Sequence, residues 1–319
     1  MSDTPQLPEL LSVRDFLRFA VSRFREAGLT FGHGTSTALD DAAFLILETL
    51  HLPIDTLEPW LDARLTRNER VQLAATIEKR VVTRKPSAYI TRSAYLGRHR
   101  FYVDERVIVP RSFLGELMVE AENDGGLPFG LDAPPLRILD LCTGSGCLAI
   151  VAAHLFPHAD VTAVDLSEEA LAVAAENVKR HGLDGRVALV KGDLFAGLGG
   201  APFDLIVTNP PYVTAGAVAR FPVEHQAEPV MAHLGGADGM DLVRRILAGA
   251  ATHLAPSGTL VVEVGQGRDT LEAAYPQLPF LWLDTELSQG EVFALAAETL
   301  QVEKKPSAKR PRARPARAV

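Results

Sequence analysis

The first ninety residues place apolar side chains at helical spacing. Apolar positions recur at steps of three and four residues on one helix face: Leu10, Val13, Leu17, Val21 and Phe24. A second helical segment begins near Asp41, after a break at Gly32-His33-Gly34, and a third starts behind a Thr66 cap that is followed by Glu69. We therefore expect a helical amino-terminal domain over residues 1–92. Its loop residue His33 has no cluster of partners in the sequence, which is typical of a structural or solvated histidine.

A different pattern follows, in which short apolar runs alternate with helical segments. Residues 95–103 and 106–109 indicate a short β-hairpin ended by Pro110, so residues 93–112 are expected to form a linker. A helix should open at Pro110-Arg111, with Arg111 and Glu116 either paired along it or shaping the cleft at the domain junction. Further strands are expected at 137–141, 160–165, 186–190, 203–208 and 258–264, with a terminal antiparallel pair at 280–283 and 291–295. This alternation predicts an α/β domain over residues 113–300.

Length and composition suit a globular protein of about two domains. The chain has 319 residues, of which 47% are hydrophobic and 23% charged, and its formal charge is −8. The segment from Lys304 to Val319 holds seven basic residues and no acid, so the remainder of the chain stands at −15. We expect residues 301–319 to form a basic disordered tail. It is either a solvated extension, which we favour, or a contact for RNA or another acidic surface.

The amino terminus carries no recognisable targeting signal. Residues 1–9 contain acids and no basic cluster, and three charged side chains interrupt the apolar stretch from Leu10 to Val21. The two cysteines, Cys142 and Cys147, lie too close together for a useful disulfide, which fits a reducing compartment. We expect a cytoplasmic protein without membrane contact.

The expected strand over 203–208 ends at the most informative motif, Asn209-Pro210-Pro211-Tyr212. Ligands bind at the carboxyl edge of an open parallel sheet. The side-chain oxygen of Asn209 and the main-chain oxygen of Pro210, in a segment stiffened by two prolines, could accept both hydrogens of a planar NH2 group, and Tyr212 offers a flat face. We therefore assign catalysis to Asn209, Pro210 and Tyr212, and substrate binding to the whole motif. Taken alone, Asn-Pro favours a plain turn equally well.

A glycine turn lies upstream, between the expected strand at 137–141 and an apolar helix at 148–155. Gly144 and Gly146 let the backbone pass close beneath a ligand, and the helix amino terminus offers free N–H groups. The spacing alone could equally hold a dinucleotide. However, no Arg or Lys lines the turn, which favours a zwitterionic nucleoside over a pyrophosphate.

Acidic residues follow the neighbouring strands at the same edge. Asp165 suits two ribose hydroxyls, Asp193 could accept a bond from an adenine amine, and Asp140 could meet a cationic amino-acid group. The residues that we expect to bind the cofactor all lie at strand ends or in the glycine turn: Asp140, Thr143, Gly144, Gly146, Asp165, Asp193, Leu194 and Asn209. We expect no metal ion at this site.

These motifs together resemble the class I S-adenosylmethionine-dependent methyltransferases, and within them the HemK/Prm family of protein glutamine methyltransferases. The resemblance is carried by five segments: Asp140 to Cys147, Asp165, Gly192 to Phe195, Thr208 to Tyr212, and Glu263 to Gly265. It covers roughly residues 10–295. It implies S-adenosylmethionine as cofactor, a Rossmann-like seven-stranded sheet in the order 3-2-1-4-5-7-6, and an amino-terminal domain that recognises a protein substrate.

One branch of that family is more similar than its siblings. Its pattern matches Phe31 to Thr35, Asp40 to Ala42, and Val109 to Leu117, and the resemblance implies a glutamine of large-subunit ribosomal protein number three as the methylated group. Release-factor methyltransferases usually carry Pro-Asp-Thr-Glu where this chain has Ser112 to Gly115. Alternatives are glutamine methylation of release factors, methylation of adenine amines in nucleic acid, and a ribosome-assembly factor that binds the cofactor without turnover. The acidic body argues against nucleic acid.

Overall fold

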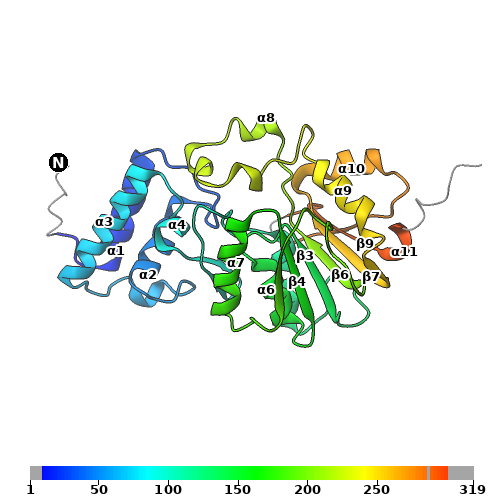
Figure 1. The fold of residues 1–319 in the computed structure, drawn as a ribbon. Coiled ribbons are helices and arrows are strands. Elements are labelled where there is room, and N and C mark those ends of the chain that lie inside the picture. Colours follow the sequence, from blue (N-terminus) through cyan, green and yellow to red (C-terminus); the bar gives the residue numbers. More distant parts are fainter. Residues whose placement is uncertain (1–8, 286–287, 301–319) are drawn as a thin grey trace, which may run out of the picture.

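The computed structural model describes residues 9–285 and 288–300, which form a helical part followed by an α/β part (Figure 1). The expected basic tail, 301–319, lies outside the described residues. Within the described residues, no helix combines the length and the apolar character needed to span a membrane.

The helical part is a small bundle with its own core. Its helices are α1 (Val13–Glu26), α2 (Ala38–Thr49), α3 (Arg67–Thr83) and α4 (Ser87–Thr91), with a 3-10 turn at Glu58–Trp60. Thr66 caps α3 as expected, and the Glu69 side chain bonds back to the Thr66 backbone. Phe16, Phe24 and Leu45 are fully buried between the helices. Arg80 is buried with them, and its Nε donates to Asp41 Oδ2 at 3.0 Å.

The linker differs from the expected hairpin. The two strands are β1 (Ala94–Leu96) and β2 (His99–Phe101), so the hairpin lies inside the first of the two expected segments. Residues 106–109 form no strand because their N–H groups bond elsewhere: Val107 N donates to Asp104 O and Val109 N to the Glu228 side chain. The next helix, α5 (Phe113–Asp124), begins at a Ser112 cap instead of Pro110-Arg111.

A seven-stranded mixed sheet forms the α/β part. Its strands are β3 (Arg137–Leu141), β4 (Asp160–Asp165), β5 (Val187–Lys191), β6 (Phe203–Thr208), β7 (Leu254–Glu263), β8 (Leu281–Leu283) and β9 (Val292–Ala296). The order across the sheet is β5-β4-β3-β6-β7-β9-β8, with β9 antiparallel to both of its neighbours. Counted from β3, this is the order 3-2-1-4-5-7-6 that the resemblance implied.

Helices cover both faces of the sheet. One core packs α5, α6 (Cys147–Leu155) and α7 (Glu168–Arg180) against inward residues such as Ile138 and Leu205. The other packs α9 (Asp241–Ala250), α10 (Arg268–Ala274) and α11 (Ala297–Leu300) against the alternate residues, such as Leu139 and Ile206. With both faces buried, the carboxyl edge of the strands is left for a ligand site.

A long connection between β6 and α9 runs across this edge toward the helical part (Figure 1). It contains α8 (Ala215–Val218) and 3-10 turns at Val223–Ala227 and Val230–Ala232. Glu224 in this connection is fully buried, accepts from Thr30 N at 3.1 Å and pairs with Arg84. The connection therefore links the sheet edge to the helical bundle.

Candidate functional site

Two adjoining cavities open at the carboxyl edge of the sheet. The first, of about 300 Å³, is lined by Asp165, Asp193 and Leu194, and the second, of about 220 Å³, by Thr143, Pro210 and Tyr212 among others. Both share the same dividing wall: Ile108, Cys142, Gly144, Asn209, Pro211 and Ala232. Asn209 therefore stands where a ligand in one cavity meets a ligand in the other.

Asp165 holds the wall of the first cavity together. Its Oδ2 accepts from Gly144 N at 2.8 Å and its Oδ1 from Ser167 N at 2.9 Å, so one carboxylate joins the glycine turn to the start of α7. Burial raises the pKa of Asp165, against the effect of these N–H donors. Each carboxylate oxygen keeps a further lone pair, which leaves acceptors for hydroxyl groups in the cavity.

The rest of this lining also suits a nucleoside. Asp193 takes part in an ion pair with Arg245 of α9 at 2.8 Å and lines the cavity beside the apolar side chains of Val164 and Leu242. The one Lys or Arg in the lining is Arg106, whose guanidinium bonds twice to Asp104 at 2.6 and 2.8 Å. Acceptors and apolar walls thus dominate, and the cation is already paired.

Asp140 and Gly146 lie beneath the glycine turn and line neither cavity. Asp140 has no exposed surface, and its Oδ2 accepts from Thr143 Oγ1 and from Ala149 N at the start of α6. Burial raises the pKa of Asp140 to about 7. Gly146 has φ +81°, and a Cβ there would lie 3.2 Å from that of Ala174 on α7. In this structure both residues shape the turn from below.

A buried carboxylate orients the Asn-Pro-Pro-Tyr motif. Glu263, 1% exposed at the end of β7, accepts through Oε1 from Asn209 Nδ2 at 3.0 Å and from the Tyr212 hydroxyl at 3.1 Å. Its Oε2 accepts from Ser112 Oγ at 2.6 Å. Burial raises the pKa of Glu263 to about 7. Because the Asn209 NH2 group is bound to Glu263, its Oδ1 is left as an acceptor for a ligand.

Glu263 lies in one of the segments that carry the resemblance, but no role was predicted for it, and its bond with Ser112 was not predicted. One signal was present, because Glu263 ends the strand that lies beside the strand ending in Asn209. Three glycines let the motif pack tightly. A Cβ at Gly265 would lie 2.7 Å from the Tyr212 ring, and Cβ atoms at Gly235 and Gly239 would meet the backbone of Pro211 and Tyr212.

Arg111 belongs to a second buried network beside the second cavity. It donates to both oxygens of Glu228 at 2.7 Å and lines the second cavity. Of the two alternatives for Arg111, the pair with Glu116 along the helix is not formed. His233 Nε2 lies 3.1 Å from the same carboxylate. His33 of the helical part is 6% exposed, and its ring centroid lies 4.1 Å from that of His225 with the two rings tilted by 52°. Burial lowers the pKa of His33 to about 3. The network joins the two parts of the chain.

Known proteins are similar in sequence to this chain over nearly its whole length. The family model named Methyltransferase small domain matches residues 130–226. A ribosomal protein uL3 glutamine methyltransferase from Bradyrhizobium diazoefficiens is 54% identical, with 92% of each chain covered. Proteins of the same name from Neisseria meningitidis serogroup B and Burkholderia pseudomallei are 54% and 53% identical, over 92% and 91% of this chain and 95% of each of theirs.

Proposed function

This chain belongs to the family of ribosomal protein uL3 glutamine methyltransferases, and on that premise we propose that it methylates a glutamine side-chain nitrogen of uL3 with S-adenosylmethionine as the methyl donor. The relatives confirm the family and the glutamine methyltransferase activity that the resemblance implied. The observation that carries the mechanism is the position of Asn209, which lines both cavities and is held by Glu263.

The first cavity fits the donor. Asp165 would accept from the ribose hydroxyls and Asp193 from the adenine amine, with Leu194 and Val164 as apolar walls. The donor supplies an electrophilic methyl group carried on a sulfonium sulfur. The chain's part is to hold that methyl toward Asn209 and the second cavity.

The second cavity would take the glutamine side chain. An amide nitrogen is a weak nucleophile because its lone pair is delocalised into the carbonyl. Asn209 Oδ1 and the Pro210 carbonyl oxygen, each accepting one amide N–H, would fix the nitrogen and favour the positive charge that develops as it attacks. The Tyr212 ring would pack against the amide plane. Alignment of this kind requires no catalytic histidine.

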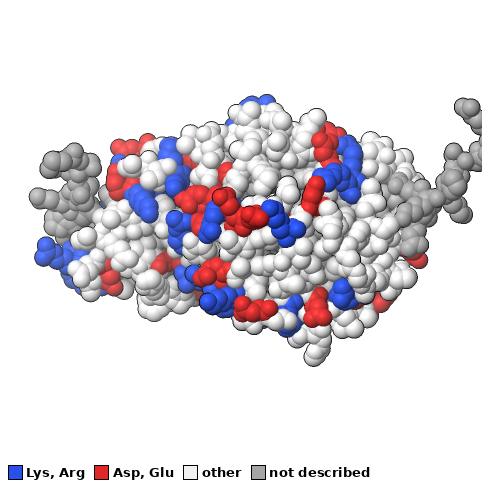
Figure 2. Space-filling model, in the orientation of Figure 1, with Lys and Arg blue, Asp and Glu red and all other residues white. Residues whose placement is uncertain are grey.

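The connection that crosses the sheet edge carries several exposed apolar side chains. Four of them are Val223 (55% exposed), Val230 (59%), Met231 (51%) and Leu234 (42%). Met231 and Leu234 also line the first cavity. Such a cluster suits a protein segment better than a nucleic acid. On the face drawn in Figure 2, Lys and Arg are interspersed with Asp and Glu and form no single basic field.

Mapping the transferred methyl group tests this function. The protein is incubated with isotopically labelled S-adenosylmethionine, purified uL3 and ribosomal RNA, and the products are analysed by mass spectrometry. We expect label on one uL3 glutamine. Label on adenine would mean that the same site acts on a nucleic acid. Binding of the donor without any label would favour a non-enzymatic assembly factor.

Removing the Asp165 carboxylate should weaken donor binding. We expect Asp165→Ala to raise the Kd for S-adenosylmethionine about 10- to 100-fold, because it removes acceptors for the ribose and frees Gly144 N. Isothermal titration calorimetry measures the change. Asp160→Ala, at the exposed opposite end of the same strand, is the matched control. Unchanged affinity in Asp165→Ala would move the ribose site elsewhere.

A further inference from the structure

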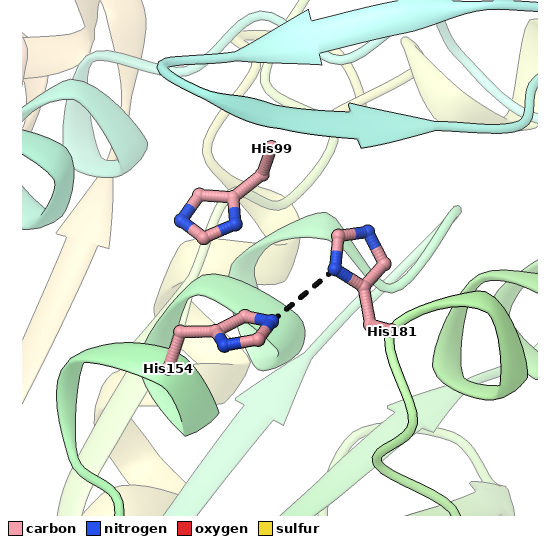
Figure 3. Close-up of side chains that lie close together, drawn as sticks. All are labelled: His99, His154 and His181. Carbon is pink, nitrogen blue, oxygen red and sulfur yellow. Dashed lines mark hydrogen bonds between the residues drawn. The ribbon is translucent and has the colours of Figure 1, made fainter.

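Three histidines meet outside both cavities, on elements far apart in the sequence. His99 lies in β2, His154 in the last turn of α6, and His181 at the end of α7 (Figure 3). One nitrogen of each ring lies within 4.8 Å of the other two, and His154 Nε2 is 3.2 Å from His181 Nδ1. This is the one such group that the described residues contain. No sequence motif links the three positions, so the cluster could not be predicted from the sequence.

The outer nitrogens of two rings are already occupied. His99 Nε2 lies 2.8 Å from Glu122 Oε2, and His181 Nε2 lies 3.0 Å from the Arg100 carbonyl oxygen. Since an ionised carboxylate and a carbonyl can only accept, both Nε2 atoms carry hydrogens. In the neutral rings the lone pairs are then on Nδ1, and Figure 3 shows one nitrogen of His99 turned toward the other two rings. Metal-bound histidines have such outer partners almost without exception.

The arginines near the three histidines are all paired with carboxylates, so they carry no unpaired positive charge that would repel a bound cation. Arg98, Arg100 and Arg180 line the same surface pocket as the three histidines. Each is paired with a carboxylate: Arg98 with Glu122 at 2.6 Å, Arg100 with Glu48 at 2.7 Å, and Arg180 with Glu176 at 2.8 Å. The pocket is open to solvent, so water can reach the centre of the cluster.

We propose that His99, His154 and His181 bind a divalent transition-metal ion, with Zn²⁺ as the best fit and a water molecule as fourth ligand. Zn–N bonds of about 2.0–2.1 Å in a tetrahedron place ligand nitrogens about 3.3 Å apart. The His154–His181 separation of 3.2 Å is close to this value, and the longest separation has to shrink by about 1.5 Å at most. The His99 ring stacks on His154 with 21° between the ring planes, so it also has to turn for its nitrogen to face the ion. On binding, the hydrogen on His154 Nε2 is exchanged through solvent for one on Nδ1 of the same ring, so that His154 stays neutral and its Nε2 lone pair faces the ion. The bound ion ties the linker hairpin to α6 and α7 of the methyltransferase domain.

Zinc binding to the metal-free, untagged, full-length chain tests the site, since a polyhistidine tag would itself bind the ion. Equilibrium dialysis with Zn²⁺ should give one tight equivalent. His154→Ala and His181→Ala should each weaken binding by about 100-fold or more, and Glu122→Gln by about 10- to 100-fold. His158→Ala, an exposed histidine just beyond α6, is the matched control and should bind like the parent.

Two further readouts keep the test independent of folding defects. Zn²⁺ should raise the Tm of the parent and of His158→Ala but not that of His154→Ala, because an ion stabilises only the state that binds it. Circular dichroism without metal should be the same for all variants. The proposal is overturned if the parent binds no more Zn²⁺ than His154→Ala, or if tight binding survives both histidine substitutions, which would place the ion on other ligands such as the cysteines.

Discussion

Asn209→Ala should lower kcat about 10²- to 10³-fold while leaving the Kd for S-adenosylmethionine nearly unchanged. The substitution removes the side-chain oxygen that would accept one amide hydrogen, so the glutamine nitrogen loses its alignment with the methyl group. The donor keeps Asp165 and Asp193 in the first cavity. Single-turnover methylation of uL3 and calorimetry with the donor measure the two quantities separately.

Tyr212→Phe is the graded comparison for this result. It keeps the ring but removes the hydroxyl bond to Glu263, which contributes about 1 kcal/mol, so we expect a loss of less than about tenfold. If Asn209→Ala methylates uL3 at a near-normal rate, the role given to Asn209 is wrong. If its donor affinity falls together with its rate, the residue acts on the first cavity and not on the glutamine.

Glu228→Ala should destabilise the protein by about 3–5 kcal/mol, because it leaves the Arg111 cation largely desolvated and without a partner. Although burial alone would raise the pKa of Glu228, the bonds from Arg111 hold that pKa well below its usual range. A depressed pKa stabilises the folded state above the unfolded pKa of about 4.5, and this contribution is lost as the pH falls further. Urea unfolding at pH 7 and at pH 4 measures both effects.

Glu78→Ala is the matched control, since Glu78 pairs with Arg23 on the surface with 45% of its side chain exposed. Such pairs contribute less than about 1 kcal/mol. A cost for Glu228→Ala no larger than that for Glu78→Ala would contradict the importance of the buried pair. We also expect Glu228→Ala to lose less stability relative to the parent at pH 4 than at pH 7.

The fold could be predicted wherever the local pattern and the buried position agree. The Thr66 cap of α3 and the end of β6 before Asn209 follow from residues within a few positions of one another. The linker shows where this fails. Residues 106–109 are as apolar as a strand, but the donor of Val109 bonds to Glu228, 119 residues away, and no local signal encodes that partner.

The same distinction separates the predicted site residues from the missed ones. Asp165 ends one parallel strand and Asn209 directly follows another, so the strand topology alone predicts that both lie at the carboxyl edge of the sheet. The bond from Asn209 to Glu263 joins residues 54 positions apart, and that from Arg111 to Glu228 joins residues 117 apart. The three clustered histidines are likewise brought together only by the packing of β2, α6 and α7. Pairs of side chains between loops and strand ends could be identified only from the structure.

The buried Glu224 restricts which helical parts this chain could accept in place of its own. Its partners, Thr30 N and Arg84, both belong to the helical part, whereas Glu224 itself belongs to the connection that carries the site. A chimera that received the helical part of a methyltransferase with another substrate, without equivalents of these partners, would leave a carboxylate buried and unpaired. The two halves of the molecule are therefore not independent modules, and an exchanged helical part needs a matching connection.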